Sequence, residues 1–117
     1  MSISKHHTSP RMSQLVIHGD TVYLAGQVAN DFDANATVQT EQVLEKIDEL
    51  LAEAETDKSK ILSAQVWLAN MGHFDQMNHV WEAWMPAGHA PARACIEAHL
   101  ASPDLLVEIG IIAACQD

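Results

Sequence analysis

The segment APARACIEAHLASPDLLVEIGIIAA, residues 90–114, predicts two consecutive strands with different surroundings. Residues 93–100 alternate polar and apolar side chains, which is typical of a strand with one polar and one apolar face. Residues 105–114 are apolar throughout except for Glu108, which is typical of a strand covered on both faces. Arg93 and Glu108 are therefore the first candidates for chemistry, because each is a charged side chain on a predicted sheet strand.

Each candidate has a structural and a functional interpretation. Arg93 either pairs with one of the chain's 16 carboxylates or presents its planar guanidinium to a ligand carboxylate. Glu108 is either solvated on an edge strand, or buried with a raised pKa that suits a general base acting on water. Cys95 shares the face of Arg93, but His99 lies about 13 Å further along the strand, too far to activate the thiol. A covalent role for Cys95 is therefore disfavoured.

Two segments predict amphipathic helices. Residues 37–55 carry apolar side chains with a period of 3.6 and acidic side chains between them. Residues 73–85 place four large apolar side chains at helical spacing, and Pro86 and Gly88 end the helix. We interpret the tryptophans of this region as core or interface packing.

Further strands precede these helices. Residues 14–18 and 21–25 flank Gly19-Asp20, which predicts a hairpin with a type II′ turn. Residues 61–69 are apolar on both faces and predict a central strand. The predicted order is ββ-α-β-α-ββ, an α+β two-layer domain with two helices on one face of a mixed β-sheet.

The length of 117 residues predicts a single domain, residues 1–117. Residues 1–13 are polar and include Pro10, so we expect them to form a flexible N-terminal arm. A domain of this size buries only about two-thirds of its unfolded surface, so assembly into an oligomer would add stability.

The charge balance excludes several classes of partner. The chain has 6 Lys+Arg against 16 Asp+Glu, a formal net charge of -10, and no cluster of basic residues. This composition argues against nucleic-acid binding and a polybasic membrane anchor. Since the sequence has no apolar run of membrane-spanning length, no secretory h-region and only two cysteines, we expect a cytoplasmic protein.

The sequence predicts no metal site and no cofactor. Its seven histidines form no pair at metal-ligand spacing beside carboxylates, and Cys95 and Cys115 are isolated from each other. Glycine-rich phosphate loops and the GxSxG motif are also absent from the sequence.

Segment 90–114 resembles the signature of the RidA/YjgF family of reactive-intermediate (enamine/imine) deaminases, in its YoaB-like branch. That signature is a P-A-R-x-C-[IV]-E strand followed, fifteen residues after its arginine, by a glutamate in V-E-I. The resemblance continues in the IHGDTVY hairpin, in QTEQVLEKIDELL, and in FDQMNHVWEAW with the following AGHAP. It covers nearly the whole chain.

The resemblance implies a chorismate-mutase-like fold and a homotrimer with a cleft at each subunit interface. The implied activity is hydrolysis of small 2-imino or enamine acids to 2-keto acids and ammonia, without a cofactor. Arg93 would hold the substrate carboxylate and Glu108 would activate water. The other implied substrate-binding residues are Ala25, Gly26, Cys95, Met12 and Asn78.

Two positions depart from the family's best-studied branch. Met12 stands where that branch has an aromatic residue, and Ala25 stands where it often has serine. A second hypothesis is therefore a non-catalytic protein that binds small carboxylates or keto acids in the same cleft. A third, an endoribonuclease or translation inhibitor, conflicts with the acidic charge.

A simple hairpin between the last two strands would place Arg93 about four residues, or roughly 13 Å, from Glu108 along the strands. A three-carbon imino acid cannot span that separation. We therefore expect either a different register or a cleft completed across subunits, with the two side chains converging to roughly 6–8 Å in the oligomer.

Overall fold

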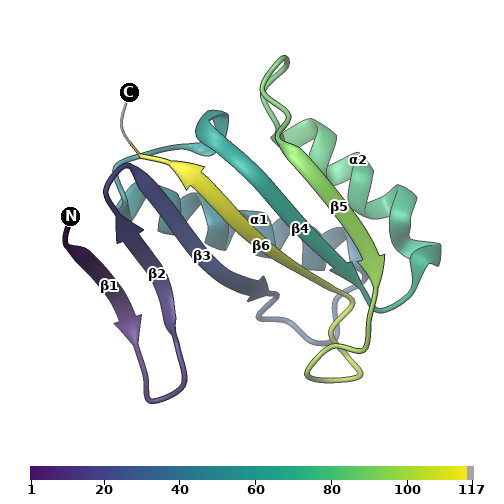
Figure 1. Ribbon diagram of the computed structural model, residues 1–117. Helices are drawn as coiled ribbons and strands as arrows, with labels where there is room; N and C mark the ends of the chain where they lie inside the picture. The colour runs from purple at the N-terminus through teal and green to yellow at the C-terminus, as the bar shows by residue number, and fades with distance from the viewer. Residues whose placement is uncertain (116–117) are drawn as a thin grey trace.

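The computed structural model describes residues 1–115 as one six-stranded sheet with two helices on the same face (Figure 1). The elements in chain order are β1 (Ile3–Thr8), β2 (Ser13–His18), β3 (Thr21–Val28), α1 (Ala36–Glu53), β4 (Ile61–Leu68), α2 (Phe74–Trp84), β5 (Ala92–Glu97) and β6 (Val107–Ala114), with short 3-10 helices at Lys58–Lys60 and Met71–His73. The predicted α+β class, with both helices on one face, is confirmed.

The strand order in the sheet is β1-β2-β3-β6-β4-β5. All neighbouring pairs are antiparallel except β4 and β5, which are parallel, so the sheet is mixed as predicted. The last two strands do not form a hairpin, because β4 lies between β5 and β6. The simple register considered from the sequence is therefore wrong.

The expectation of a flexible arm over residues 1–13 is also wrong, because residues 3–8 form strand β1, paired antiparallel with β2. The order of elements is thus βββ-α-β-α-ββ. In β1 every side chain is exposed except that of His6, which is half-buried. Backbone pairing at a sheet edge does not require apolar side chains, so the hydrophobic pattern gave no signal for this strand.

The β2–β3 hairpin has the predicted turn. Gly19 has a φ of 63°, whereas Asp20 is not among the residues with positive φ, as a type II′ turn requires. His18 pairs with Thr21 across this turn. Strand β3 extends three residues beyond the predicted end, to Val28, through an irregularity of register between Leu24 and Gln27.

Helix α1 begins after Asn35, whose side chain accepts a hydrogen bond from the backbone N–H of Val38. Its apolar stripe is buried against the sheet. The fully or nearly fully buried side chains of this stripe are those of Val43, Leu44, Ile47 and Leu51. They pack with apolar residues from β2, β3, β4, β6 and α2 into one core cluster. None of the helices within residues 1–115 is long and apolar enough to cross a membrane.

Strand β5 turns the polar face predicted from its alternation toward the helices. Arg93 and Cys95 pair with the buried residues Ala64 and Val66 of β4, so they lie on the helix-covered face. Ile96 is 52% exposed on the open face. Alternation reports that a strand has two faces, but packing against α2 decides which face is covered.

Candidate active site

Glu108 lies on the open face of the sheet, in the central strand β6. It is paired with Trp67 of β4 on one side and with Val28 of β3 on the other. Its side chain is half-buried. The interpretation of Glu108 as a solvated residue of an edge strand is therefore wrong.

Gly26 makes room for the Glu108 side chain. A Cβ added to Gly26 would overlap the Glu108 carboxylate, with the carboxyl carbon only 2.9 Å away. The irregular segment between Leu24 and Gln27 brings this glycine against the neighbouring strand. The carboxylate thus lies directly against the β3 backbone, where only glycine leaves space.

Burial raises the pKa of the Glu108 carboxyl above its usual range. The cause is desolvation, which disfavours the charged form of a carboxyl group. A carboxyl group with a raised pKa exchanges protons more readily near neutral pH than an ordinary glutamate does.

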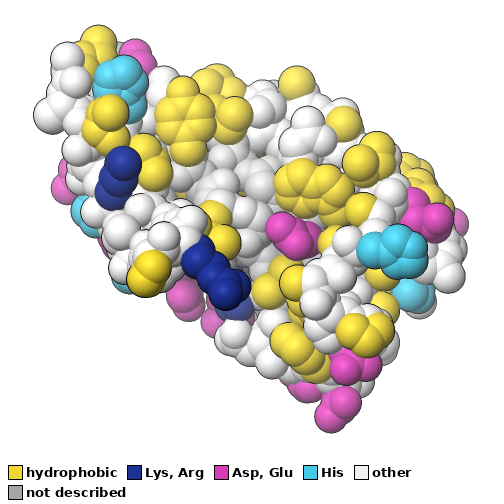
Figure 2. Space-filling model, turned by 60° about the horizontal axis from the view of Figure 1, so that its bottom comes forward, with side chains coloured by type: hydrophobic (Ala, Val, Ile, Leu, Met, Phe, Trp, Pro, Cys, Tyr) yellow, Lys and Arg dark blue, Asp and Glu magenta, His cyan; other side chains and the backbone are white. Residues whose placement is uncertain are grey.

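A cavity of about 630 Å³ opens beside Glu108, between the end of the β1–β2 hairpin, the end of β3, helix α1 and the loop before β6. Its lining residues are His7, Met12, Gln14, Gly26, Gln27, Val28, Lys46, Glu49, Leu50, Glu53, Ala101, Leu105 and Glu108. Figure 2, which looks onto this end of the molecule, shows a hollowed surface where acidic and basic side chains lie beside hydrophobic ones. This volume falls within the range of small-molecule sites.

Gln39 holds the loop that forms one wall of this cavity. Its side chain is fully buried, donates to the carbonyl oxygens of Ala34 and Asp104, and accepts from the backbone N–H of Leu106. Helix α1 is thereby tied to the segment that leads into β6 and Glu108.

Arg93 lies on the other face of the sheet. Its guanidinium carbon is 5.2 Å from the centre of the Trp81 ring, and its Nη1 donates to the Met77 sulfur at 3.8 Å. Both partners belong to α2. No ion pair between Arg93 and a carboxylate occurs within residues 1–115. The Arg93 charge instead makes a cation–π interaction with the Trp81 ring.

Three further predicted site residues have different surroundings. Cys95 is half-buried against the core, and burial raises the pKa of its thiol, although the nearby Arg93 charge acts in the opposite direction. Asn78 lies half-buried in α2, next to Met77, and Ala25 lies half-buried in β3. A raised pKa keeps the thiol protonated, which disfavours a nucleophilic role for Cys95.

Within one chain, the predicted site residues fall into two groups. Met12, Gly26 and Glu108 line the cavity. Arg93 and Cys95 lie on the face covered by α2, at the β5 edge of the sheet. The single chain therefore does not bring Arg93 to Glu108.

Some cavity residues were missed by the sequence interpretation. Glu49 and Glu53 were interpreted as part of the solvated acidic face of helix α1, but they line the cavity together with Lys46. The Gln27 side chain of β3 donates a hydrogen bond of 2.8 Å to the Gln14 side chain of β2. The available signal was Gln27, a polar residue directly after Gly26.

No three His, Cys, Asp or Glu side chains are grouped as metal ligands in the part of the chain that the structure describes.

The sheet, its two helices and the cavity beside Glu108 make up a small α+β protein. The family model described as Endoribonuclease L-PSP matches residues 3–115 of the chain. The chain belongs to this family, whose curated relatives include RutC family proteins. The RutC family protein of Haemophilus ducreyi is 46% identical, over 96% of each chain. The RutC family protein YoaB of Escherichia coli is 42% identical, over 97% of this chain and 99% of its own.

A solved structure has the same architecture. The crystal structure of NMB1025, a member of the YjgF protein family from Neisseria meningitidis, matches with a TM-score of 0.97 and 44% identity. The match covers 100% of this chain and 98% of that chain. The family resemblance identified in the sequence is thus confirmed.

Proposed function

We propose that this protein hydrolyses small reactive 2-imino or enamine acids to 2-keto acids and ammonia. The observation that carries the proposal is the Glu108 carboxyl, half-buried against Gly26 at the edge of an open cavity that would admit a small organic acid. Family membership supports the same activity through the matching positions of Arg93, Cys95 and Glu108.

In this proposal Glu108 acts as the proton-transfer group. It takes a proton from water as the water oxygen bonds to the imine carbon, and the electron pair of the C=N bond moves to nitrogen. The proton then passes to that nitrogen, which gives a carbinolamine. The hydroxyl proton of the carbinolamine moves to the same nitrogen as the C–N bond breaks, so ammonia leaves and the C=O bond forms. The raised pKa of Glu108 supports both proton transfers.

Arg93 would hold the substrate carboxylate through two parallel hydrogen bonds. Because it lies on the face opposite Glu108, the proposed site needs Arg93 from one copy of the chain and Glu108 from another. We therefore propose a ring-shaped homo-oligomer, a trimer by family resemblance, in which Met12, Gly26 and Glu108 of one subunit face Arg93, Cys95 and Asn78 of the next.

The open face of the sheet supports such an assembly. It exposes large apolar side chains from four strands, namely Tyr23, Leu62, Ile96 and Ile112. An apolar surface of this kind is typical of a protein interface.

The test is a direct assay. An amino-acid oxidase generates 2-iminopropanoate or 2-iminobutanoate in situ, and keto-acid formation is followed with and without the protein. We expect acceleration by the wild-type chain and its loss in Arg93→Ala and Glu108→Ala. Equal rates with and without wild-type protein would reject the activity.

A second candidate function is binding of small carboxylates or keto acids without turnover. Met12 favours it, because this 52% exposed side chain lines the cavity where the deaminase branch has an aromatic residue. Binding of 2-oxobutanoate without any acceleration of imine hydrolysis would select this candidate. An endoribonuclease activity, which the family description carries, is disfavoured by the net charge of -10.

A further inference from the structure

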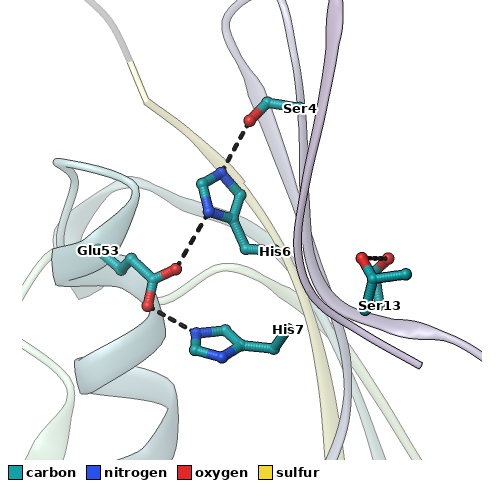
Figure 3. Close-up of polar contacts among 6 residues, drawn as sticks. Ser4, His6, His7, Ser13 and Glu53 are labelled. Carbon is teal, nitrogen blue, oxygen red and sulfur yellow. Dashed lines mark hydrogen bonds and ion pairs between the residues drawn. The ribbon is translucent and has the colours of Figure 1, made fainter.

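Glu53, on the last turn of α1, contacts two adjacent histidines of β1. One Glu53 carboxylate oxygen is 2.8 Å from His7 Nε2 and the other is 3.3 Å from His6 Nδ1. Figure 3 shows the two imidazoles approaching the carboxylate from different sides. The other ring nitrogen of His6, Nε2, shares a hydrogen bond of 2.8 Å with the Ser4 hydroxyl.

The backbone of His7 makes this arrangement possible. Consecutive side chains of a regular strand point to opposite faces, so adjacent histidines would not reach the same group. His7 has a φ of 54°, in the left-handed region that a residue with a Cβ adopts at a cost. Its neighbours His6 and Thr8 pair with β2, whereas His7 is not in the register. The positive φ turns the His7 ring toward α1.

Strand β1 has little else to hold it against the helix layer. Its side chains are exposed except for that of His6. An edge strand without buried apolar side chains belongs to the least stable part of a fold. Contacts to Glu53 therefore supply much of the attachment of β1 to α1, whereas β2 is held to β3 by backbone pairing and by the Gln27–Gln14 hydrogen bond.

The same residues form one wall of the cavity beside Glu108. His7, Met12 and Gln14 line it from the hairpin, while Glu53 and Glu49 line it from α1. The separation of the hairpin from α1 therefore sets the width of the cavity.

We infer that Glu53 is a positioning residue, which holds the β1–β2 hairpin through His6 and His7 so that the hairpin forms a fixed wall of the substrate cavity. Glu53 does not touch the reacting atoms and acts through Met12 and Gln14. Only the effect of Glu53 on substrate affinity rests on the proposed function. Attachment of the hairpin is a property of the chain alone.

The test compares Glu53→Ala and His7→Ala with Glu45→Ala, which removes the same charge from an exposed position of the same helix. Amide hydrogen exchange of β1 should become about threefold to tenfold faster in the first two variants, because exposed ion pairs of this kind stabilise modestly. Exchange of β1 in Glu45→Ala and exchange of β6 in all three variants should stay at the wild-type rate. His7→Ala leaves α1 intact, so it decides the result if Glu53→Ala fails to fold.

The kinetic measurement separates positioning from general damage. We expect KM for the imino acid to rise about fivefold in Glu53→Ala and His7→Ala, with kcat within about twofold of wild type, because Glu108 is unchanged. Unchanged β1 exchange in both variants would overturn the inference, as would an equal rise of KM in Glu45→Ala. If the wild-type chain shows no turnover, the proposed function fails, and β1 exchange together with the affinity for 2-oxobutanoate still tests the positioning role.

Discussion

Arg93 and Glu108 lie on opposite faces of one sheet, with strand β4 between their strands. Arg93 pairs with Ala64 and faces α2, whereas Glu108 pairs with Trp67 and faces the open side. Their positions along the sheet also differ by three residues of β4. An active site that uses both residues must therefore combine two chains.

Subunit complementation tests this requirement. Arg93→Ala and Glu108→Ala should each be inactive alone, but refolding an equal mixture should restore about a quarter of the wild-type activity, since a quarter of randomly formed interfaces combine both intact residues. The measurement is imine hydrolysis by the mixture, with separately refolded variants combined afterwards at low concentration as the control. A mixture as inactive as its components would contradict a shared site.

Glu108→Gln should lower kcat by about 100-fold or more, because the amide cannot transfer the proton. It should also raise the thermal midpoint at pH 7 to 8. Burial raises the pKa of Glu108, so the folded chain holds this proton more strongly than the unfolded chain, and stability falls as pH rises through the range between the two pKa values.

The stabilisation by Glu108→Gln should therefore disappear at a pH below the unfolded-state pKa, where the wild-type carboxyl is protonated in both states. Thermal unfolding of both proteins across this pH range checks the sign. A stabilisation that is larger in acid than at pH 8 would show that burial does not control this group.

Gly26→Ala should strongly reduce activity and destabilise the chain by about 1–3 kcal/mol, because the new Cβ overlaps the Glu108 carboxylate. Gly110→Ala is the matched control in the same sheet, where the added Cβ would meet the Trp67 ring at 3.4 Å. Denaturant unfolding and the imine assay measure both effects. Equal losses in the two variants would argue against a specific role for Gly26.

Gln39→Ala should destabilise the chain by about 2–4 kcal/mol, because it removes three hydrogen bonds that the buried Gln39 side chain makes with the backbone of Ala34, Asp104 and Leu106. Gln65→Ala, at an exposed position of β4, should change stability by less than about 0.5 kcal/mol. Urea unfolding of both variants checks this. A change in Gln39→Ala no larger than in the control would show that the loop before β6 does not depend on Gln39.

Cys95 should react slowly with iodoacetamide at pH 7 relative to a free cysteine, because burial raises the pKa of its thiol. A Cys115→Ser background isolates the Cys95 reaction. Replacing Arg93 by alanine should slow it further, since the Arg93 charge lowers this pKa. A faster reaction after that replacement would mean that access, not charge, limits the thiol.

Much of the architecture could be predicted from periodicity. Strong local signals mark the 3.6-residue apolar stripe of α1, the hairpin at Gly19-Asp20 and the apolar strands β4 and β6. The helix and strands have such signals because the apolar side chains that they bury recur with the period of the element. Strand β1 had no such signal, since its side chains remain exposed.

The candidate site was only partly predictable. Arg93 was identified because it is one of only two arginines in an acidic chain, Glu108 because it is the one charge in an apolar strand, and Gly26 because of the family resemblance. The side chains of Glu49 and Glu53 look like part of a solvated acidic helix face in the sequence, and only the position of the β1–β2 hairpin makes them cavity residues, together with Lys46.

The sequence by itself therefore determined the fold class, the family and the residue types available for chemistry. The tertiary structure decided which face of the sheet each charged side chain occupies, because the order of β5, β4 and β6 and the packing of α2 depend on contacts between distant parts of the chain. A strand's alternation separates its two faces, but the helix layer covers one of them and leaves the other for a ligand or a second chain.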